Sequence, residues 1–146
     1  MNVDESLDLA EELVRRDYPP ARVERHLGPG MDVSGPGYQI VSVAVSDVFW
    51  EEPAERWDEA WRQAEEERGQ LVAALSGRWG PPRPRSFRAD LERAIRGEPL
   101  PPLADVLAEF VAEADTWHRH GRSVCVALGQ WDKEFPIQLV LAVGEL

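Results

Sequence analysis

The amino-acid sequence predicts an α+β protein with an antiparallel sheet of about 3–5 strands that ends in a C-terminal meander. Two observations support this fold class. Helical periodicity dominates the first two thirds of the chain, and strand-like alternation is concentrated near its end, without alternating βαβ units. We expect the sheet to pack against a long acidic helix and several shorter helices. Because 146 residues are the size of one domain, residues 1–146 are predicted to form a single globular unit.

The N-terminal third contains two predicted helices, a loop and a strand. Apolar side chains recur with helical spacing over residues 4–17, and two consecutive prolines can open a second short helix over residues 19–27. Residues 28–37 are rich in glycine but lack the lysine of a phosphate-binding loop, so they are predicted to be a plain loop. Valine alternates with small residues over residues 38–48, which predicts a strand.

The long helix is predicted over residues 53–76, with Gly77 as its C-terminal cap. Trp57 and Trp61 stand four residues apart on the side that carries the other apolar residues. This spacing is more typical of core positions than of a binding surface. We therefore place both tryptophans on the inner side of the helix.

The rest of the chain is predicted to be a proline-rich connector, two helices and the meander. The connector covers residues 78–85, and the helices cover residues 86–97 and 103–114. The apolar period then changes from that of a helix to that of a strand. Strands are predicted over residues 116–119, 123–128 and 137–143, with turns at His120-Gly121 and at residues 130–134.

Two of these strands each have a face of small side chains. The residues are Ser42, Ala44 and Ser46 in one strand, and Ser123, Cys125 and Ala127 in the other. If the faces align, either a helix packs closely on the sheet there or a shallow groove stays open. A groove would suit a small-molecule ligand.

The long helix carries most of the net charge of the chain. Residues 51–67 contain eight carboxylates and two arginines, a net charge of −6, against −11 for all 146 residues. A rigid acidic surface attracts basic partners and repels nucleic acid, although a charge run is also common on an ordinary solvated helix face. We expect no binding to nucleic acid or to an anionic membrane, since both require basic patches.

We assign candidate partner-binding residues to this helix and to two tryptophans near turns. Trp50 at a strand–helix junction and Trp131 in a charged turn have less core to enter, and exposed tryptophan is frequent in interface hot spots. The alternative for Trp131 is that it folds back over Pro136 or a neighbouring strand. The candidate residues are Trp50, Glu51, Glu55, Asp58, Glu59, Glu65, Glu66 and Trp131.

The sequence favours a binding protein over an enzyme. His118 and His120 could place two ligands on one face of a strand, but His120-Gly121 fits a solvated hairpin turn and a second ligand cluster is missing. Cys125 lies in the middle of an apolar strand, where a small buried filler is common. The nucleophile motif Gly-x-Ser-x-Gly is absent. We assign no catalytic residue, no metal ligand and no cofactor.

The run GQWDKEFPIQLVLAVGE, together with the connector WGPP after an acidic tryptophan-bearing helix, resembles small actinobacterial α+β proteins. That resemblance implies no activity and no functional residue. In class and charge, the chain is also similar to immunity proteins of bacterial toxin systems. A single cysteine, an acidic N-terminus and the lack of an apolar run of about 20 residues lead us to expect a cytoplasmic protein.

The leading hypothesis is a non-enzymatic acidic protein-binding module, most concretely an immunity or inhibitor protein that engages a basic partner. Nuclease toxins are basic because they bind phosphates, so an acidic inhibitor would be steered onto them. The alternative is a small-molecule binder or enzyme that uses a cleft beside the small-residue sheet faces. A third hypothesis is a homodimer that pairs through an edge strand of the meander.

Overall fold

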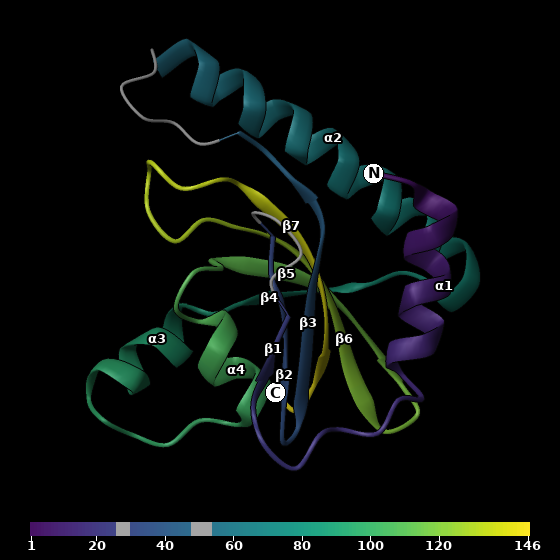
Figure 1. Cartoon of the computed structure of the whole chain (residues 1–146), viewed down its shortest axis with the longest axis vertical. Coiled ribbons are helices and arrows are strands. Elements are labelled where there is room, and N and C mark those ends of the chain that lie inside the picture. Colours follow the sequence, from purple (N-terminus) through teal and green to yellow (C-terminus); the bar gives the residue numbers. More distant parts are fainter. Residues whose placement is uncertain (26–29, 48–53) are drawn as a thin grey trace.

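The computed structural model describes residues 1–25, 30–47 and 54–146 (Figure 1). Within this part, the chain is α+β, as predicted. The helices are α1 (Val3–Leu13), α2 (Ala54–Trp79), α3 (Arg88–Ile95) and α4 (Pro102–Leu107). The strands are β1 (Val23–Glu24), β2 (Asp32–Gly35), β3 (Tyr38–Val45), β4 (Arg83–Ser86), β5 (Glu113–Arg119), β6 (Arg122–Gly129) and β7 (Gln138–Gly144). Trp50 and Glu51 lie outside the described residues.

The described strands form one antiparallel sheet in the order β1-β2-β3-β7-β6-β5-β4. The sheet has seven strands, so the predicted 3–5 is wrong, although the meander β5-β6-β7 is confirmed. His120 and Gly121 both have positive φ angles, 51° and 73°, which suits a tight two-residue hairpin turn between β5 and β6. β7 lies at the centre of the sheet, and all of its residues are buried.

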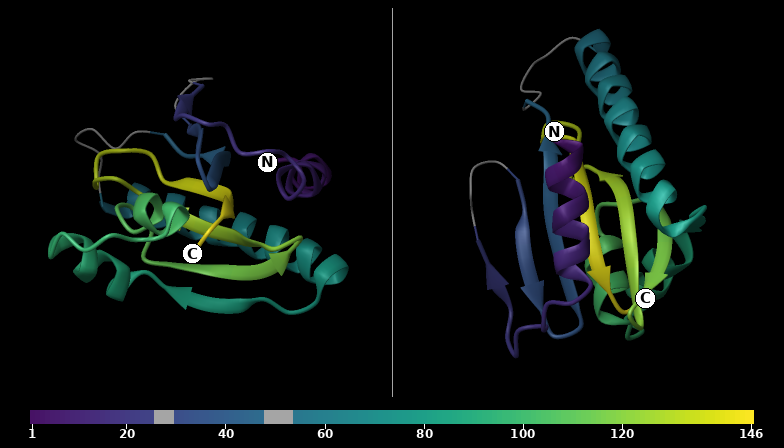
Figure 2. Two further views of the ribbon diagram at one scale, coloured as in Figure 1. Left: turned by 90° about the horizontal axis from the view of Figure 1, so that it is seen from below. Right: turned by 90° about the vertical axis from the view of Figure 1, so that its right-hand side faces the viewer.

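Helices cover both faces of the sheet (Figure 2). One core cluster joins α1 and α2 to side chains such as Val126, Leu139 and Leu141 on the same sheet face. The second cluster joins α4 and the buried Phe87 to the opposite face, where the central strands present Val140 and other small or β-branched side chains. The sheet therefore lies between two layers of helix, with α2 the longest element on its side.

Both edges of the sheet consist of short strands that the sequence pattern did not predict. β1 has two residues and lies in the segment predicted as a helix over residues 19–27. β2 lies in the predicted loop over residues 28–37, and β4 falls at the end of the predicted connector. The edge strands β1 and β4 lack apolar alternation, because an edge strand buries few of its side chains. β4 also carries Pro84, which has no N–H to donate to another strand.

The ends of two helices also differ from the prediction. α2 continues through Gly77 to Trp79 and is capped by Gly80, which has a φ of 85° and donates its N–H to the Ser76 carbonyl at 2.9 Å. α4 ends at Leu107, so the predicted helix over residues 103–114 is too long. The remainder passes into β5, where Ala114 pairs with Arg85 of β4.

β3 contains a bulge that separates the small residues of its predicted small face. Ser42 pairs with Val140 of β7, but Ala44 pairs with the next β7 residue, Leu139. Val43 is therefore an extra residue in the ladder. Because the side chains of a strand alternate between faces, the bulge places Ala44 on the α2 side of the sheet, opposite Leu139. Ser42 stays on the other face and donates a hydrogen bond to the Gln138 side-chain carbonyl at 2.5 Å.

Candidate functional site

The acidic outer surface of α2 is the first candidate site. With 26 residues, α2 is about 39 Å long, whereas a strand of seven or eight residues spans about 25 Å. The N-terminal turns of α2 therefore extend past the end of the sheet (Figure 1). Four predicted partner-binding residues are exposed on this helix: Glu55, Asp58, Glu59 and Glu66. We call these four residues the acidic surface.

Glu65, a fifth predicted residue on α2, has a different environment. Its carboxylate accepts a hydrogen bond from the Arg68 Nε at 3.0 Å, and the Arg68 guanidinium also pairs with Asp115 of β5. Burial lowers the pKa of Arg68, but hydrogen bonding and charge from Glu65, together with Asp115, outweigh it and leave that pKa raised. Glu65 thus belongs to an ion-pair network that ties α2 to the sheet.

A second candidate site lies between α2 and the β4–β5 side of the sheet. It is a cleft of about 390 Å³, which we call the aromatic cleft. Its lining residues are Trp57, Trp61, Glu65, Arg68, Pro84, Phe110, Ala112, Glu113, Ala114, Asp115, Leu128 and Gln130. The titratable members are three carboxylates and one arginine, which gives the cleft a net charge of −2.

The two tryptophans of α2 form one wall of the aromatic cleft. Their rings stack with centroids 5.5 Å apart and planes inclined by 17°. The indole N–H of Trp57 donates to the Gln130 side-chain carbonyl at 3.2 Å. Both tryptophans are only half-buried, and Trp61 packs at the margin of the core while Trp57 does not belong to it. Trp57 thus lies on the side of α2 that faces the sheet, as predicted, but it stays outside the core.

Trp131 adds an aromatic surface beside the aromatic cleft. Its ring stacks on Phe110, with centroids 4.4 Å apart and an interplanar angle of 14°. Trp131 thus folds back, but onto Phe110 rather than Pro136, and 42% of it remains exposed. Phe135 in the same turn is 48% exposed. The Gln130 side chain fixes this turn by donating to the carbonyls of Lys133 at 3.2 Å and Phe135 at 2.8 Å.

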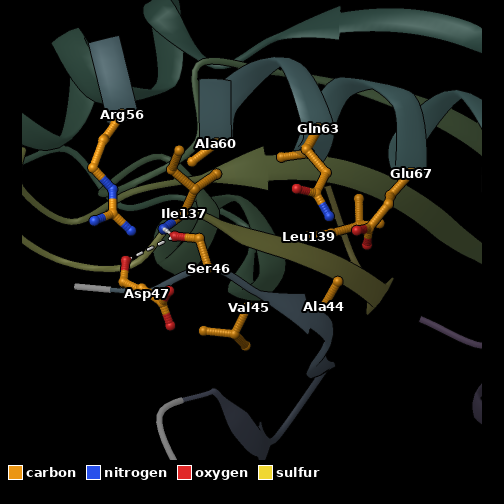
Figure 3. A pocket seen from close by; sticks show the side chains of 11 residues that line it. Ala44, Val45, Ser46, Asp47, Arg56, Ala60, Gln63, Glu67, Ile137 and Leu139 are labelled. Carbon is orange, nitrogen blue, oxygen red and sulfur yellow. Dashed lines mark hydrogen bonds between the residues drawn. The ribbon is translucent and has the colours of Figure 1, made fainter. Parts of the chain in front are cut away.

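A third candidate site is a larger cleft of about 560 Å³ between α2 and the ends of β3 and β7 (Figure 3). We call it the polar cleft. Its lining residues are Ala44, Val45, Ser46, Asp47, Arg56, Ala60, Gln63, Ala64, Glu67, Ile137 and Leu139. The Ser46 hydroxyl accepts the Ile137 N–H at 2.8 Å and donates to the Asp47 carbonyl at 3.0 Å. One oxygen of Glu67 is buried without a hydrogen-bond partner among the described residues.

The two small-residue faces therefore differ in what covers them. In β6, Cys125 and Ala127 are fully buried beneath α4 and Phe110, so close helix packing covers this face. In β3, the bulge turns Ala44 and Ser46 toward α2, where they line the polar cleft. Close packing thus covers the small face of β6, whereas two of the three small residues near the end of β3 line a cleft.

The structure places Cys125 in the core and both His118 and His120 at the surface. Burial raises the pKa of the Cys125 thiol to about 12, with a smaller opposing effect of Arg85, so the thiol stays protonated near neutral pH. His118 and His120 are exposed, and His120 lies in the hairpin turn. Within residues 1–25, 30–47 and 54–146, histidine, cysteine and carboxylate side chains do not converge in groups of three that could hold a metal ion.

Comparison of the chain with protein-family models, with curated proteins and with solved structures gave no match. The candidate sites therefore rest on their own geometry and chemistry. None of the described helices combines the length and the apolar character that crossing a membrane requires.

Proposed function

We propose that this chain is a non-enzymatic protein-binding module that engages a basic protein partner, in the manner of an immunity or inhibitor protein. The observation that carries the proposal is the exposure of Glu55, Asp58, Glu59 and Glu66 on a rigid helix that extends past the sheet. Four carboxylates on one helix repel one another, and a cationic partner would relieve that repulsion.

A protein interface also needs large side chains that supply binding energy, and the turn after β6 exposes two of them. Charges steer the encounter, but most of the binding energy of interfaces comes from a few large side chains, among which tryptophan is enriched. Trp131 and Phe135 are the large exposed aromatic residues of the described part, and they lie in the turn that Gln130 connects to α2. We assign steering to the acidic surface and anchoring to Trp131.

A capture experiment with matched charge variants tests this proposal. The test variant changes Glu55, Glu59 and Glu66 to glutamine. The control variant removes the same number of charges from exposed positions of α1 and α4: Glu5→Gln, Asp8→Asn and Asp105→Asn. The wild type and the control should retain the same basic protein from a native-type lysate at low salt, and the test variant should lose it.

The identified partner then allows a quantitative test. Its association rate with the test variant should be at least about tenfold slower at low salt, and it should depend less on ionic strength. Equal association rates for the test and control variants, or capture that does not respond to salt, would refute a role for the acidic surface.

A second candidate function is small-molecule binding in the polar cleft, and Glu67 is the observation that favours it. A carboxylate oxygen that is buried without a partner in the described part suits a ligand that donates a hydrogen bond, such as an amine. Cationic metabolites should then raise the melting temperature of the wild type and not of Glu67→Gln. An unchanged melting temperature across such a panel contradicts this function.

A further inference from the structure

We infer that the aromatic cleft binds the guanidinium group of an arginine side chain that projects from the basic partner. This inference rests on the proposed function, since it assigns a specific contact within that complex. It concerns a surface separate from Glu55, Asp58, Glu59 and Glu66, because none of these four residues lines the cleft.

The charges of the cleft favour a cation. Glu65 and Asp115 hold Arg68 between them. Glu113 is exposed at the same cleft and has no ion-pair partner in the part of the chain that the structure describes. A second cation would therefore find a carboxylate that is not already paired, in a cleft whose net charge is −2.

The walls of the cleft favour arginine over lysine. Trp57, Trp61 and Phe110 contribute aromatic rings, and tryptophan gives the strongest cation–π contact. A guanidinium group is planar and more weakly hydrated than an ammonium group, so it can stack on a ring while it donates to a carboxylate. The cleft offers both partners, because Glu113 lines it together with the three rings.

The same kind of contact recurs in the fold of this chain. The guanidinium of Arg122 lies 4.1 Å from the centroid of the Tyr18 ring. Arg85 lies 5.0 Å from the Phe87 centroid, and Arg119 lies 5.4 Å from the Trp79 centroid. Trp57 and Trp61 instead stack on each other. An arginine side chain of the partner would place a cation on the Trp57 and Trp61 rings.

The cleft is also held in place before any ligand enters. The side-chain carbonyl of Gln130 accepts the Trp57 N–H, and its amide group donates to carbonyls in the turn between β6 and β7. Arg68 holds α2 against β5 at the other end. A site that is ordered in advance loses less entropy on binding.

A titration that follows the indole N–H signals by two-dimensional NMR tests the inference. The probe is N-acetyl-arginine amide, and its control is N-acetyl-citrulline amide, which has nearly the same shape without the charge. Trp57→Phe and Trp61→Phe identify the two signals. Arginine should shift both signals saturably, with half-saturation on the order of 10 mM, and citrulline should not. Glu113→Gln should weaken binding of the arginine probe about two- to fivefold.

The outcomes separate this inference from the proposed function. The variant with Glu55, Glu59 and Glu66 changed to glutamine should bind the arginine probe nearly as the wild type does, because those residues lie outside the cleft. Equal shifts with arginine and citrulline, or an unchanged affinity in Glu113→Gln, would overturn the inference even if charge-dependent capture succeeds. If the NMR shifts are specific for arginine but the charge variant captures the same proteins as the wild type, the proposed function is overturned. The arginine site in the aromatic cleft would then stand on its own.

Discussion

Gly129 determines how closely Phe110 can approach the end of β6, and its replacement by alanine should destabilise the protein. A Cβ atom at this position would lie 2.6 Å from Cε2 of Phe110 and 3.1 Å from Cγ2 of Val111. The nearest ring atom, Cδ2 of Phe110, is closer still. These distances are well below van der Waals contact, so either the ring or the strand must move.

The cost follows from the environment of Phe110. Its side chain belongs to the core cluster beneath α4, and its ring also stacks on Trp131, so it cannot simply rotate into solvent. Overpacking of a buried site typically costs 1–3 kcal/mol. We therefore expect Gly129→Ala to lower the free energy of unfolding by about 2 kcal/mol. It should also change the fluorescence of the folded state, because Trp131 loses its stacking partner.

Urea unfolding followed by circular dichroism measures this free energy, and Gly69→Ala is the matched control. Gly69 lies in the interior of α2, where an added Cβ meets nothing within 4 Å. The same chemical change should there stabilise the protein by about 1 kcal/mol, because alanine favours the helix. If Gly129→Ala is as stable as the wild type, the Phe110 ring is free to move away from the end of β6, which contradicts its confinement in the core.

Two further substitutions test the ion pair between α2 and β5 and the burial of Cys125. Asp115→Asn should cost about 1 kcal/mol, because Arg68 loses one of its carboxylates where side-chain exposures are only 33% and 20%; a double-mutant cycle with Arg68→Met that gives no coupling would contradict this. The raised pKa of Cys125 predicts that its contribution to stability is constant below about pH 7.5, since the thiol is protonated in both states there. Between pH 9 and 12, only the unfolded thiol ionises, so the wild type should lose about 1.4 kcal/mol per pH unit relative to Cys125→Ala. Parallel urea curves for both proteins from pH 8 to 10.5 measure this difference, and equal slopes would show that Cys125 is not buried as described.

The central strands were predictable because their sequence pattern reflects burial. Val124, Val126 and Leu128 recur with the period of two that a buried sheet face imposes. β4 was not predictable, because its sequence of arginine, proline and serine has no apolar alternation and its place in the sheet comes from pairing with β5. The bulge at Val43 was not predictable from the sequence either. The alternation of residues 38–48 continues through it, and only the pairing with β7 reveals the change of face.

The acidic surface was predictable for a similar reason, since charged residues of an amphipathic helix face solvent. The aromatic cleft was not predictable. Glu65 and Asp115 are fifty positions apart and meet only through Arg68. The exposure of Trp57 depends on how α2 lies across the sheet, and helical spacing alone does not determine it. The only sequence feature that points to the cleft is the pair of tryptophans at a spacing of four.

The bulge in β3 also has a consequence for the length of this chain. Val43 and Ala44 together oppose the single residue Leu139. A chain that lacks Val43 would keep Ala44 opposite Leu139 and Ser46 beside the polar cleft, at the cost of the packing of one valine. Deletion of Ser42 instead would let Val43 pair with Val140, and Ala44 would again stay opposite Leu139. β3 is thus a strand in which loss of one residue leaves the wall of a cleft intact, whereas in a regular strand it would exchange the two faces.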